Sequence, residues 1–227
     1  MVQAFPQVTS AQELADLVIG GQPFAWVRYG NGEWDLVLGR GTRTGSGSQV
    51  FTNDLREAMR ETVTDHDGKI MAMQNERYLR KIGLYGKAQA WLAQHGVAID
   101  WQPADVLHHA SGNGELGPLV RALRNPVFVG PQHLARLPIA GDRISVPERN
   151  CWGYIDVIEV EVRERCAGRT VCVSAGPAAK VLIHRLRDEP MQLIDCGSLW
   201  DVYCGVISRK YHQNIDHAIA KRNHLED

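Results

Sequence analysis

The sequence predicts an α/β fold, a Rossmann-like and mainly parallel sheet with helices on both faces and a helical C-terminal extension. The main observation is that short runs of β-forming residues alternate with segments of helical periodicity, which is typical of βαβ units. The chain has 227 residues, of which 44% are hydrophobic and 22% charged, ordinary values for a globular protein. No internal repeat, low-complexity tract or linker interrupts the pattern, so residues 1–227 are predicted to form a single domain.

The first half of the chain carries clear signals for element boundaries. Ser10 is a helix cap, and Gly20 and Gly21 end the apolar periodicity that follows it. Asn53 caps another helix, and the glycine-rich residues 38–49 before it indicate a mobile loop. These signals predict helices over 11–20, 54–63 and 86–95, and strands over 24–29, 69–73 and 104–109.

The second half continues the alternation. Pro147 stops one strand, Asn150 starts the long helix that follows it, and Pro177 stands at the first position of another helix. The pattern predicts helices over 115–123, near 134, over 151–166 and over 177–186, and strands over 126–130, 143–146, 170–174 and 192–196. The remaining residues, 200–227, are expected to be mostly helical and increasingly polar.

Charge and cysteine usage exclude several classes of protein. The 25 Lys and Arg residues balance 26 Asp and Glu residues, giving a net charge of −1, so non-specific nucleic-acid binding is disfavoured. The five cysteines form no CxxC pair and indicate reduced core residues. The N-terminus lacks the features of a signal peptide, and no apolar run reaches the roughly 18 residues of a membrane span. A cytoplasmic protein without a membrane span is therefore expected.

Ligands of parallel sheets bind outside the carboxyl ends of the strands, so the residues after each strand are the first candidates. After the first strand come Arg28, Gly30, Asn31, Glu33 and Asp35. If this stretch is extended, the last three side chains alternate onto one side and offer oxygen ligands to Mg²⁺ or Mn²⁺. Arg28 adds a positive charge for a phosphate or carboxylate. The alternative is a polar turn with solvated acids above a packed Trp34.

Two later strand ends carry further candidates. Gly176 and Pro177 open a helix whose N-terminus could bind an anion, or they serve only a tight turn. Asp195 ends the last strand near the middle of the sheet, and Asp201 follows as a general base or a helix cap.

Other sequence patterns give weaker evidence for a ligand site. The segment 112–117 matches GxGxxG formally but lacks the acidic residue of a dinucleotide site. His108 and His109 are adjacent on the expected strand 104–109, so they point to opposite faces and cannot readily share one metal ion. No zinc-hydrolase or α/β-hydrolase motif occurs.

Four segments in this order resemble motifs of the GT-D-type glycosyltransferases. Residues 28–33, RYGNGE, resemble the motif R-[FY]-G-D-G-E, and residues 146–150, VPERN, resemble the segment cP-x-x-N-a before a long helix. Residues 173–182, VSAGPAAKVL, are similar to a-l-G-P-T-A-t-v-L. Residues 193–198, LIDCGS, are similar to a-i-D-i-G-H. The resemblance spans residues 24 to about 212, most of the chain.

The resemblance implies a hexosyltransferase-like enzyme that moves a sugar from a nucleotide-diphosphate donor, a UDP-sugar, to an acceptor hydroxyl on a glycan or another compound. It implies a divalent cation, Mn²⁺ or Mg²⁺, at Asn31 and Glu33, with Asp35 as a further ligand. Asn31 stands in place of the motif's Asp, and Ser198 stands in place of its His. The expected donor-binding residues are Arg28, Gly30, Asn150, Gly176, Pro177 and Ser198. The expected catalytic residues are Asp201 and Asp195.

Two other functions use the same residues. A nucleotide-dependent phosphotransferase or hydrolase would need the same acids and the same helix N-terminus. A non-catalytic protein that binds nucleotide sugars or polysaccharide would tolerate Asn31, since it needs no metal-bound leaving group.

Overall fold

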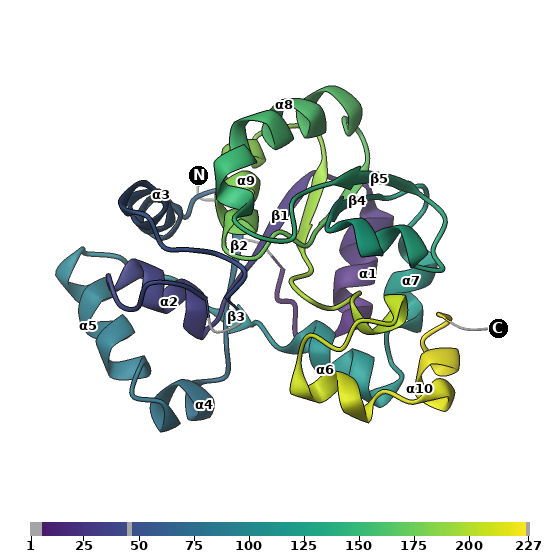
Figure 1. The fold of residues 1–227 in the computed structure, drawn as a ribbon, viewed down its shortest axis with the longest axis horizontal. Coiled ribbons are helices and arrows are strands. Elements are labelled where there is room, and N and C mark those ends of the chain that lie inside the picture. The colour runs from purple at the N-terminus through teal and green to yellow at the C-terminus, as the bar shows by residue number, and fades with distance from the viewer. Residues whose placement is uncertain (1–5, 45–46, 226–227) are drawn as a thin grey trace.

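The structure is a computed structural model that describes residues 6–44 and 47–225. Its centre is a sheet of 7 strands in the order β3-β2-β1-β7-β6-β4-β5, and every pairing in it is parallel. This confirms the predicted fold class (Figure 1). The strands are β1 (Phe24–Tyr29), β2 (Ile70–Met73), β3 (Gln102–Pro103), β4 (Val127–Gly130), β5 (Asp142–Ser145), β6 (Thr170–Val173) and β7 (Gln192–Asp195).

Helices cover both faces of this sheet. The α-helices are α1 (Ala11–Gly20), α2 (Asn31–Val37), α3 (Asn53–Thr64), α4 (Glu76–Lys81), α5 (Tyr85–Gln94), α6 (Val106–Asn113), α7 (Gly117–Ala122), α8 (Ile155–Arg165), α9 (Ala178–Leu186) and α10 (His217–Arg222). Short 3₁₀ helices complete the set: η1 (Gln132–Arg136), η2 (Cys151–Tyr154), η3 (Val202–Cys204) and η4 (Lys210–Asn214).

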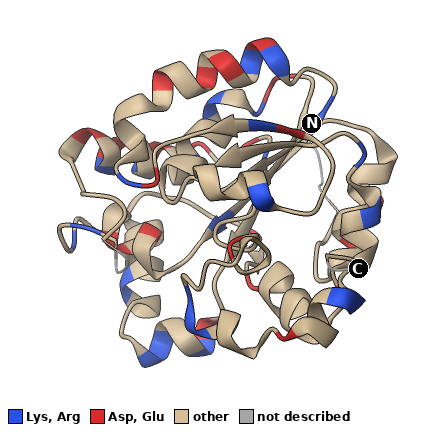
Figure 2. Cartoon of the chain, turned by 45° about the vertical axis from the view of Figure 1, so that its right-hand side comes forward, with Lys and Arg blue, Asp and Glu red and all other residues tan. Residues whose placement is uncertain are grey.

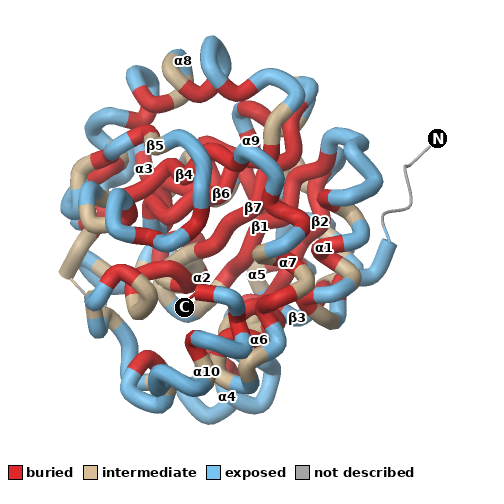
Figure 3. The backbone as a smooth tube through the Cα atoms, turned by 90° about the vertical axis from the view of Figure 1, so that its right-hand side faces the viewer, coloured by how far each residue is buried: buried red, intermediate tan, exposed pale blue. Residues whose placement is uncertain are grey.

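Alternating side chains of the strands divide the core into two layers. In β1, Ala25, Val27 and Tyr29 pack with α3, α8 and α9 on one face. Phe24 and Trp26 pack with α1, α6 and α7 on the other. Because β1 is buried on both faces, its sequence is a continuous apolar run up to Arg28. The strands β1, β2, β4, β6 and β7 are buried along their whole length and form the centre of the molecule (Figure 3).

The strand order creates a switch point at β1. The chain winds from β1 to β2 and β3 on one side, then crosses to β4 in the other half of the sheet. The carboxyl ends of β1, β7 and β6 consequently meet where the winding changes direction, the usual place for a ligand in an open α/β sheet.

The predicted strand over 104–109 is wrong. The strand β3 covers only Gln102–Pro103, and the following residues form α6, which packs Leu107 and Ala110 into the core at helical spacing. A short apolar run fits a strand and a helix equally well. The GxGxxG segment consequently lies between α6 and α7, two helices, and not between a strand and a helix.

The expected extended stretch after β1 is also wrong, since Asn31–Val37 forms α2. The Glu33 carboxylate accepts a hydrogen bond from the Gly30 N–H group at 3.0 Å and so caps the helix that contains it. On a helix, residues two positions apart do not share a face, so Asn31, Glu33 and Asp35 do not alternate onto one side as expected.

The remaining expectations concern less regular regions. The segment 200–227 folds into η3, η4 and α10, so it is helical only in short pieces, and residues 226 and 227 lie outside the described part. In the predicted loop 38–49 an antiparallel bridge joins Arg43 to Val50, and residues 45 and 46 lie outside the described part.

The five cysteines are buried and free, as predicted. Within residues 6–44 and 47–225, no helix has both the length and the apolar character that crossing a membrane requires. Acidic and basic residues are interspersed along the chain (Figure 2).

Candidate functional site

A cavity of about 890 Å³ opens at the carboxyl edge of the sheet. Its size is in the range of small-molecule sites. Residues that follow each of the strands β1 to β7 line it, so the whole edge of the sheet contributes. The lining residues include Gly30, Asn31, Glu33, Gln74, Asp105, His133, Arg149, Ser174, Gly176, Pro177, Ser198 and Asp201.

Arg28 is a buried cation of this cavity with no acidic partner. It is 7% exposed, and none of the ion pairs between described residues includes it. One guanidinium nitrogen, Nη1, donates to the Ala104 carbonyl at 3.3 Å and to His108 Nε2 at 3.2 Å. Its Nε atom is buried and has no hydrogen-bond partner. A buried charge without a counter-ion is costly, so this arrangement favours an anionic ligand.

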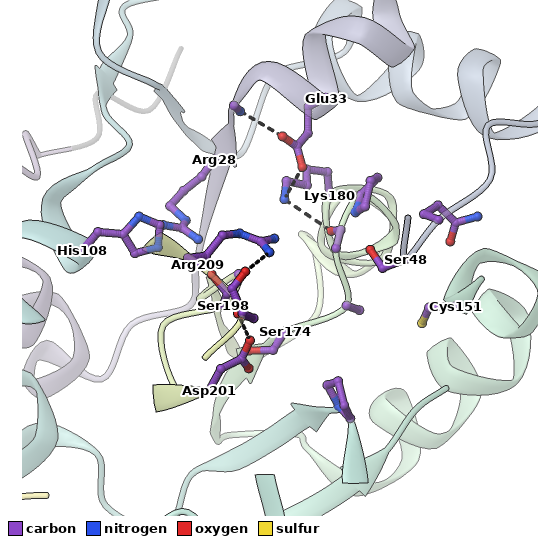
Figure 4. Close-up of a pocket in the computed structure, with 18 of the residues that line it drawn as sticks. Arg28, Glu33, Ser48, His108, Cys151, Ser174, Lys180, Ser198, Asp201 and Arg209 are labelled. Carbon is purple, nitrogen blue, oxygen red and sulfur yellow. Dashed lines mark hydrogen bonds and ion pairs between the residues drawn. The ribbon is translucent and has the colours of Figure 1, made fainter. Parts of the chain in front are cut away.

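His108 supports Arg28 as a neutral acceptor. Burial, followed by the nearby charge of Arg28, holds the pKa of His108 well below its ordinary value. Because an arginine only donates hydrogen bonds, His108 Nε2 accepts and the ring carries its proton on Nδ1. Tyr211 packs against the same ring with centroids 4.7 Å apart. Figure 4 shows His108 beside Arg28 at one side of the cavity.

Gly197 makes room for the guanidinium group. A Cβ atom at this position would overlap Arg28 Nη2, and the φ angle of Gly197 is +56°. We expect Gly197→Ala to displace the Arg28 head group and to cost about 1–2 kcal/mol of stability through the left-handed backbone. The sequence resemblance makes UDP the ligand to test, and calorimetric titration with UDP should then show a loss of affinity.

The matched control for this variant is Gly21→Ala. Gly21 also has a positive φ, +70°, but a methyl group at this position would have no atom within 4 Å, and Gly21 is remote from the cavity. Both variants should lose similar thermal stability, and Gly21→Ala should bind UDP as the unaltered chain does. Equal UDP affinity in the two variants would contradict the role given to Gly197.

Lys180 lies in the first turn of α9 between two carboxylates. Its Nζ atom is 2.9 Å from Glu33 Oε1, 3.0 Å from Asp195 Oδ2 and 3.3 Å from the Gly176 carbonyl oxygen. The side chain is 5% exposed, and Lys180 and Glu33 both line the cavity. Burial alone would lower the pKa of Lys180, but the charges of Asp195 and Glu33 raise it above its ordinary value. The ammonium group is therefore a fixed positive charge (Figure 4).

Asp195 positions the groups around it. It is fully buried and absent from the cavity lining. Besides Lys180, its carboxylate accepts hydrogen bonds at 3.1 Å from the backbone N–H groups of Arg28 and Gly197. With both oxygens engaged inside the protein, Asp195 has no access to an acceptor substrate. Of the two residues predicted as catalytic acids or bases, Asp201 alone lines the cavity.

Asp201 forms a polar pair with His133 across the cavity from Lys180. His133 Nε2 lies 2.9 Å from Asp201 Oδ1, and the Ser208 hydroxyl donates to Oδ2 at 2.5 Å. Both members of the pair are nearly buried, with side-chain exposures of 14% and 12%, and both line the cavity. A carboxylate paired with an imidazole is an arrangement that can accept a proton from a hydroxyl group.

Besides Asp195, two predicted residues lie outside the cavity lining. Asp35 is absent from it and pairs with Arg40 at 3.6 Å. Asn150 fixes the end of the glycine-rich loop: its side-chain oxygen accepts from the Val50 N–H group at 2.9 Å, and its own N–H group donates to the Ser48 carbonyl at 2.7 Å. Asn150 thus shapes the wall of the cavity without entering it. The predicted residues that do line it are Arg28, Gly30, Asn31, Glu33, Gly176, Pro177, Ser198 and Asp201.

The predicted metal ligands do not form a set that suits a divalent cation. Mg²⁺ and Mn²⁺ need several oxygen ligands, usually including carboxylates. Both oxygens of Glu33 already accept hydrogen bonds or an ion pair, Asn31 is uncharged, and Asp35 lies outside the cavity. Within the described residues, no group of three or more His, Cys, Asp or Glu side chains is placed to hold a metal ion. A bound cation would also lie close to the Lys180 ammonium group.

Sequence reasoning gave no role to several residues of the site. His133 had no recognisable signal, because it joins the cavity from the short helix η1. Arg209 belongs to a basic and aromatic cluster, residues 208–212, to which the sequence assigned no specific role. His108 was assigned to a strand and lies on α6. Lys180 was the easiest of these residues to find from the sequence. It follows Gly176 and Pro177 by one helical turn, at the start of a helix predicted to bind an anion.

Solved structures of other proteins share the fold of this chain. A solved structure described as "A New Glycosyltransferase (DUF1792) from Streptococcus sanguinis" superposes with a TM-score of 0.65 over 94% of this chain and 93% of that chain, at 20% identity. Another, described as "The highly conserved domain of unknown function 1792 has a distinct glycosyltransferase fold", gives a TM-score of 0.66 over 86% and 79%, at 18% identity. The chain has a glycosyltransferase fold.

The sequence comparisons are more distant. The chain is 24% identical over 219 residues to "Probable glycosyl transferase Gly" of Streptococcus gordonii. That match covers 78% of this chain and 30% of the length of the relative. No family model matches the sequence. The glycosyltransferase fold therefore rests on the structural similarity, and the curated relative agrees with it.

Proposed function

We propose that this chain transfers a glycosyl group from a nucleotide-diphosphate sugar to an acceptor hydroxyl. The observation that carries the proposal is Arg28, a buried guanidinium group without an acidic partner at the carboxyl edge of a parallel sheet. The diphosphate of a nucleotide sugar supplies the anion that this cation lacks. We take a UDP-hexose as the first donor to test.

The cavity offers positive charge on more than one side of a diphosphate. Arg28 comes from β1, Lys180 from the first turn of α9, Arg149 from the turn after β5, and Arg209 from the segment between η3 and η4. Gly176 at the start of α9 has a φ of +58° and no atom within 4 Å of a Cβ position, which leaves its backbone open to the cavity. Such preorganised groups stabilise negative charge as it develops on a leaving group.

The reaction uses these groups as follows. The acceptor hydroxyl oxygen forms a bond to the anomeric carbon, and the bond from this carbon to the β-phosphate oxygen breaks. The electron pair of the broken bond leaves with the nucleoside diphosphate, next to Arg28 and Lys180. The hydroxyl proton passes to the pair of Asp201 and His133 on the other side of the cavity. Direct attack of this kind inverts the anomeric configuration.

The test is an assay with a panel of nucleotide sugars, in which release of the nucleoside diphosphate and the fate of the sugar are both measured. Release of UDP together with a new glycoside or free sugar supports glycosyl transfer. Release of a sugar phosphate would indicate phosphate chemistry instead. Nucleotide-sugar binding without any turnover over a broad acceptor panel would indicate a binding protein and would contradict the proposal.

A further inference from the structure

The ammonium group of Lys180 is built into the cavity at the carboxylate that the sequence assigns to a metal. Glu33 is the only carboxylate among the three predicted metal ligands that lines the cavity. One of its oxygens is 2.9 Å from Lys180 Nζ, and the other accepts the Gly30 N–H group. The neighbouring Asp195 holds the same ammonium group at 3.0 Å. Glu33 therefore already has a cation as its partner.

Two sequence differences around Glu33 act together. Asn31 stands where the resembled motif R-[FY]-G-D-G-E has an aspartate, and Lys180 stands where the motif a-l-G-P-T-A-t-v-L has a small residue. The first removes a negative charge and the second adds a positive one. Together they make the net charge of the cavity lining more positive by two, the change that a divalent cation would bring. Both side chains line the same cavity.

We propose that this chain binds its donor and performs transfer without a divalent cation, and that Lys180 supplies the positive charge beside the diphosphate. This inference rests on the proposed function. The contact of Lys180 with the Gly176 carbonyl is its longest, at 3.3 Å, so a phosphate oxygen can replace this carbonyl as the third acceptor. Glu33 and Asp195 keep the ammonium group in place, and the charge on it stabilises the departing diphosphate.

The first experiment uses the unaltered chain. UDP is titrated calorimetrically in EDTA and again in Mn²⁺, and binding of Mn²⁺ alone is followed by the electron paramagnetic resonance signal of the free ion. We expect the two UDP affinities to agree within about twofold and the protein alone to bind no Mn²⁺ in the cavity. An increase in UDP affinity of about tenfold or more with Mn²⁺ would overturn the inference.

The second experiment restores the motif residues with the double variant Asn31→Asp and Lys180→Thr. This change returns a carboxylate and frees Glu33 and Asp195 from the ammonium group. We expect the variant to bind Mn²⁺, to lose about tenfold or more of its UDP affinity in EDTA, and to regain affinity when Mn²⁺ is added. UDP affinity that is unchanged in EDTA would overturn the role given to Lys180.

Lys69→Met is the matched control, since Lys69 is also a buried lysine. It donates to the Thr62 and Asp65 carbonyl oxygens, and it does not line the cavity. Its removal should change stability without changing the response of UDP binding to Mn²⁺. The results also separate the two proposals. Binding of UDP that requires Mn²⁺ overturns the inference and leaves the proposed function standing, whereas no binding of any nucleoside diphosphate in either buffer overturns the proposed function and the inference with it.

Discussion

Asp201→Asn is expected to lower kcat by about 10²–10⁴-fold, the usual contribution of a general base. The amide cannot take the acceptor proton, although it fills the same space beside His133 and Ser208. Because the proposed function places Asp201 beside the acceptor hydroxyl and not beside the diphosphate, UDP affinity should stay within about threefold of that of the unaltered chain. Initial rates and calorimetric titration with UDP measure the two effects separately.

The companion variant His133→Asn shows which member of the pair takes the proton. If Asp201 is the base and His133 orients it, His133→Asn should retain more activity than Asp201→Asn. If the imidazole is the base, the two variants should lose similar activity. Both alternatives require Asp201→Asn to lose activity, so full kcat in this variant would exclude the pair of Asp201 and His133 as the base. Asp195, the other predicted catalytic residue, does not line the cavity.

Arg28→Met is expected to lower donor affinity by about a hundredfold or more, since two hydrogen bonds from a charged donor contribute roughly 3–6 kcal/mol. The same change should leave the thermal midpoint equal or higher. In the free protein Arg28 is a buried cation without an acidic partner, and replacing such a charge with an apolar side chain removes its desolvation cost.

Differential scanning calorimetry and titration with UDP check these opposite effects on one variant. Arg124→Met serves as the control, because Arg124 is exposed and outside the cavity lining. It should leave both quantities unchanged. A loss of stability in Arg28→Met larger than its loss of UDP binding would show that Arg28 is a structural residue.

The fold was predictable where strand signals end at glycine or proline. Strand β1 runs through aromatic and aliphatic residues and stops before Gly30, and β6 stops before Gly176 and Pro177, so both boundaries follow from local sequence. The segment 104–109 has no such signal, and tertiary packing of Leu107 decides for a helix.

Helix α2 was missed for a different reason. Gly30 and Gly32 indicate a break after β1, but Glu33 caps the chain into a helix through the Gly30 N–H group. The capping signal, an acid three residues after the cap, was present in the sequence. It changed the arrangement of the predicted metal ligands, since Asn31, Glu33 and Asp35 no longer alternate along an extended chain and Asp35 lies outside the cavity lining.

The location of the site, at the carboxyl edge of the sheet, was predictable from the sequence. The contacts between its side chains were not. The rule that ligands bind at the carboxyl ends of parallel strands selected Arg28, Gly176 and Asp201 correctly as cavity residues. His133 and Asp201 are 68 residues apart in the chain, and only the strand order β7-β6-β4 brings them together. A single sequence contains no local signal for such a pairing.

The sheet stabilises the fold and the turns after its strands line the cavity, so the turns can be changed separately in engineering the specificity of this protein. The strands β1, β2, β4, β6 and β7 are buried along their whole length, while the turns after the strands supply the walls of the cavity. Glu148, after β5, is an exposed residue of one such wall and takes no part in the buried contacts of Arg28 and Lys180. A library randomised at this position should yield variants that accept different alcohols at little expense in folding, because exposed loop positions tolerate substitution.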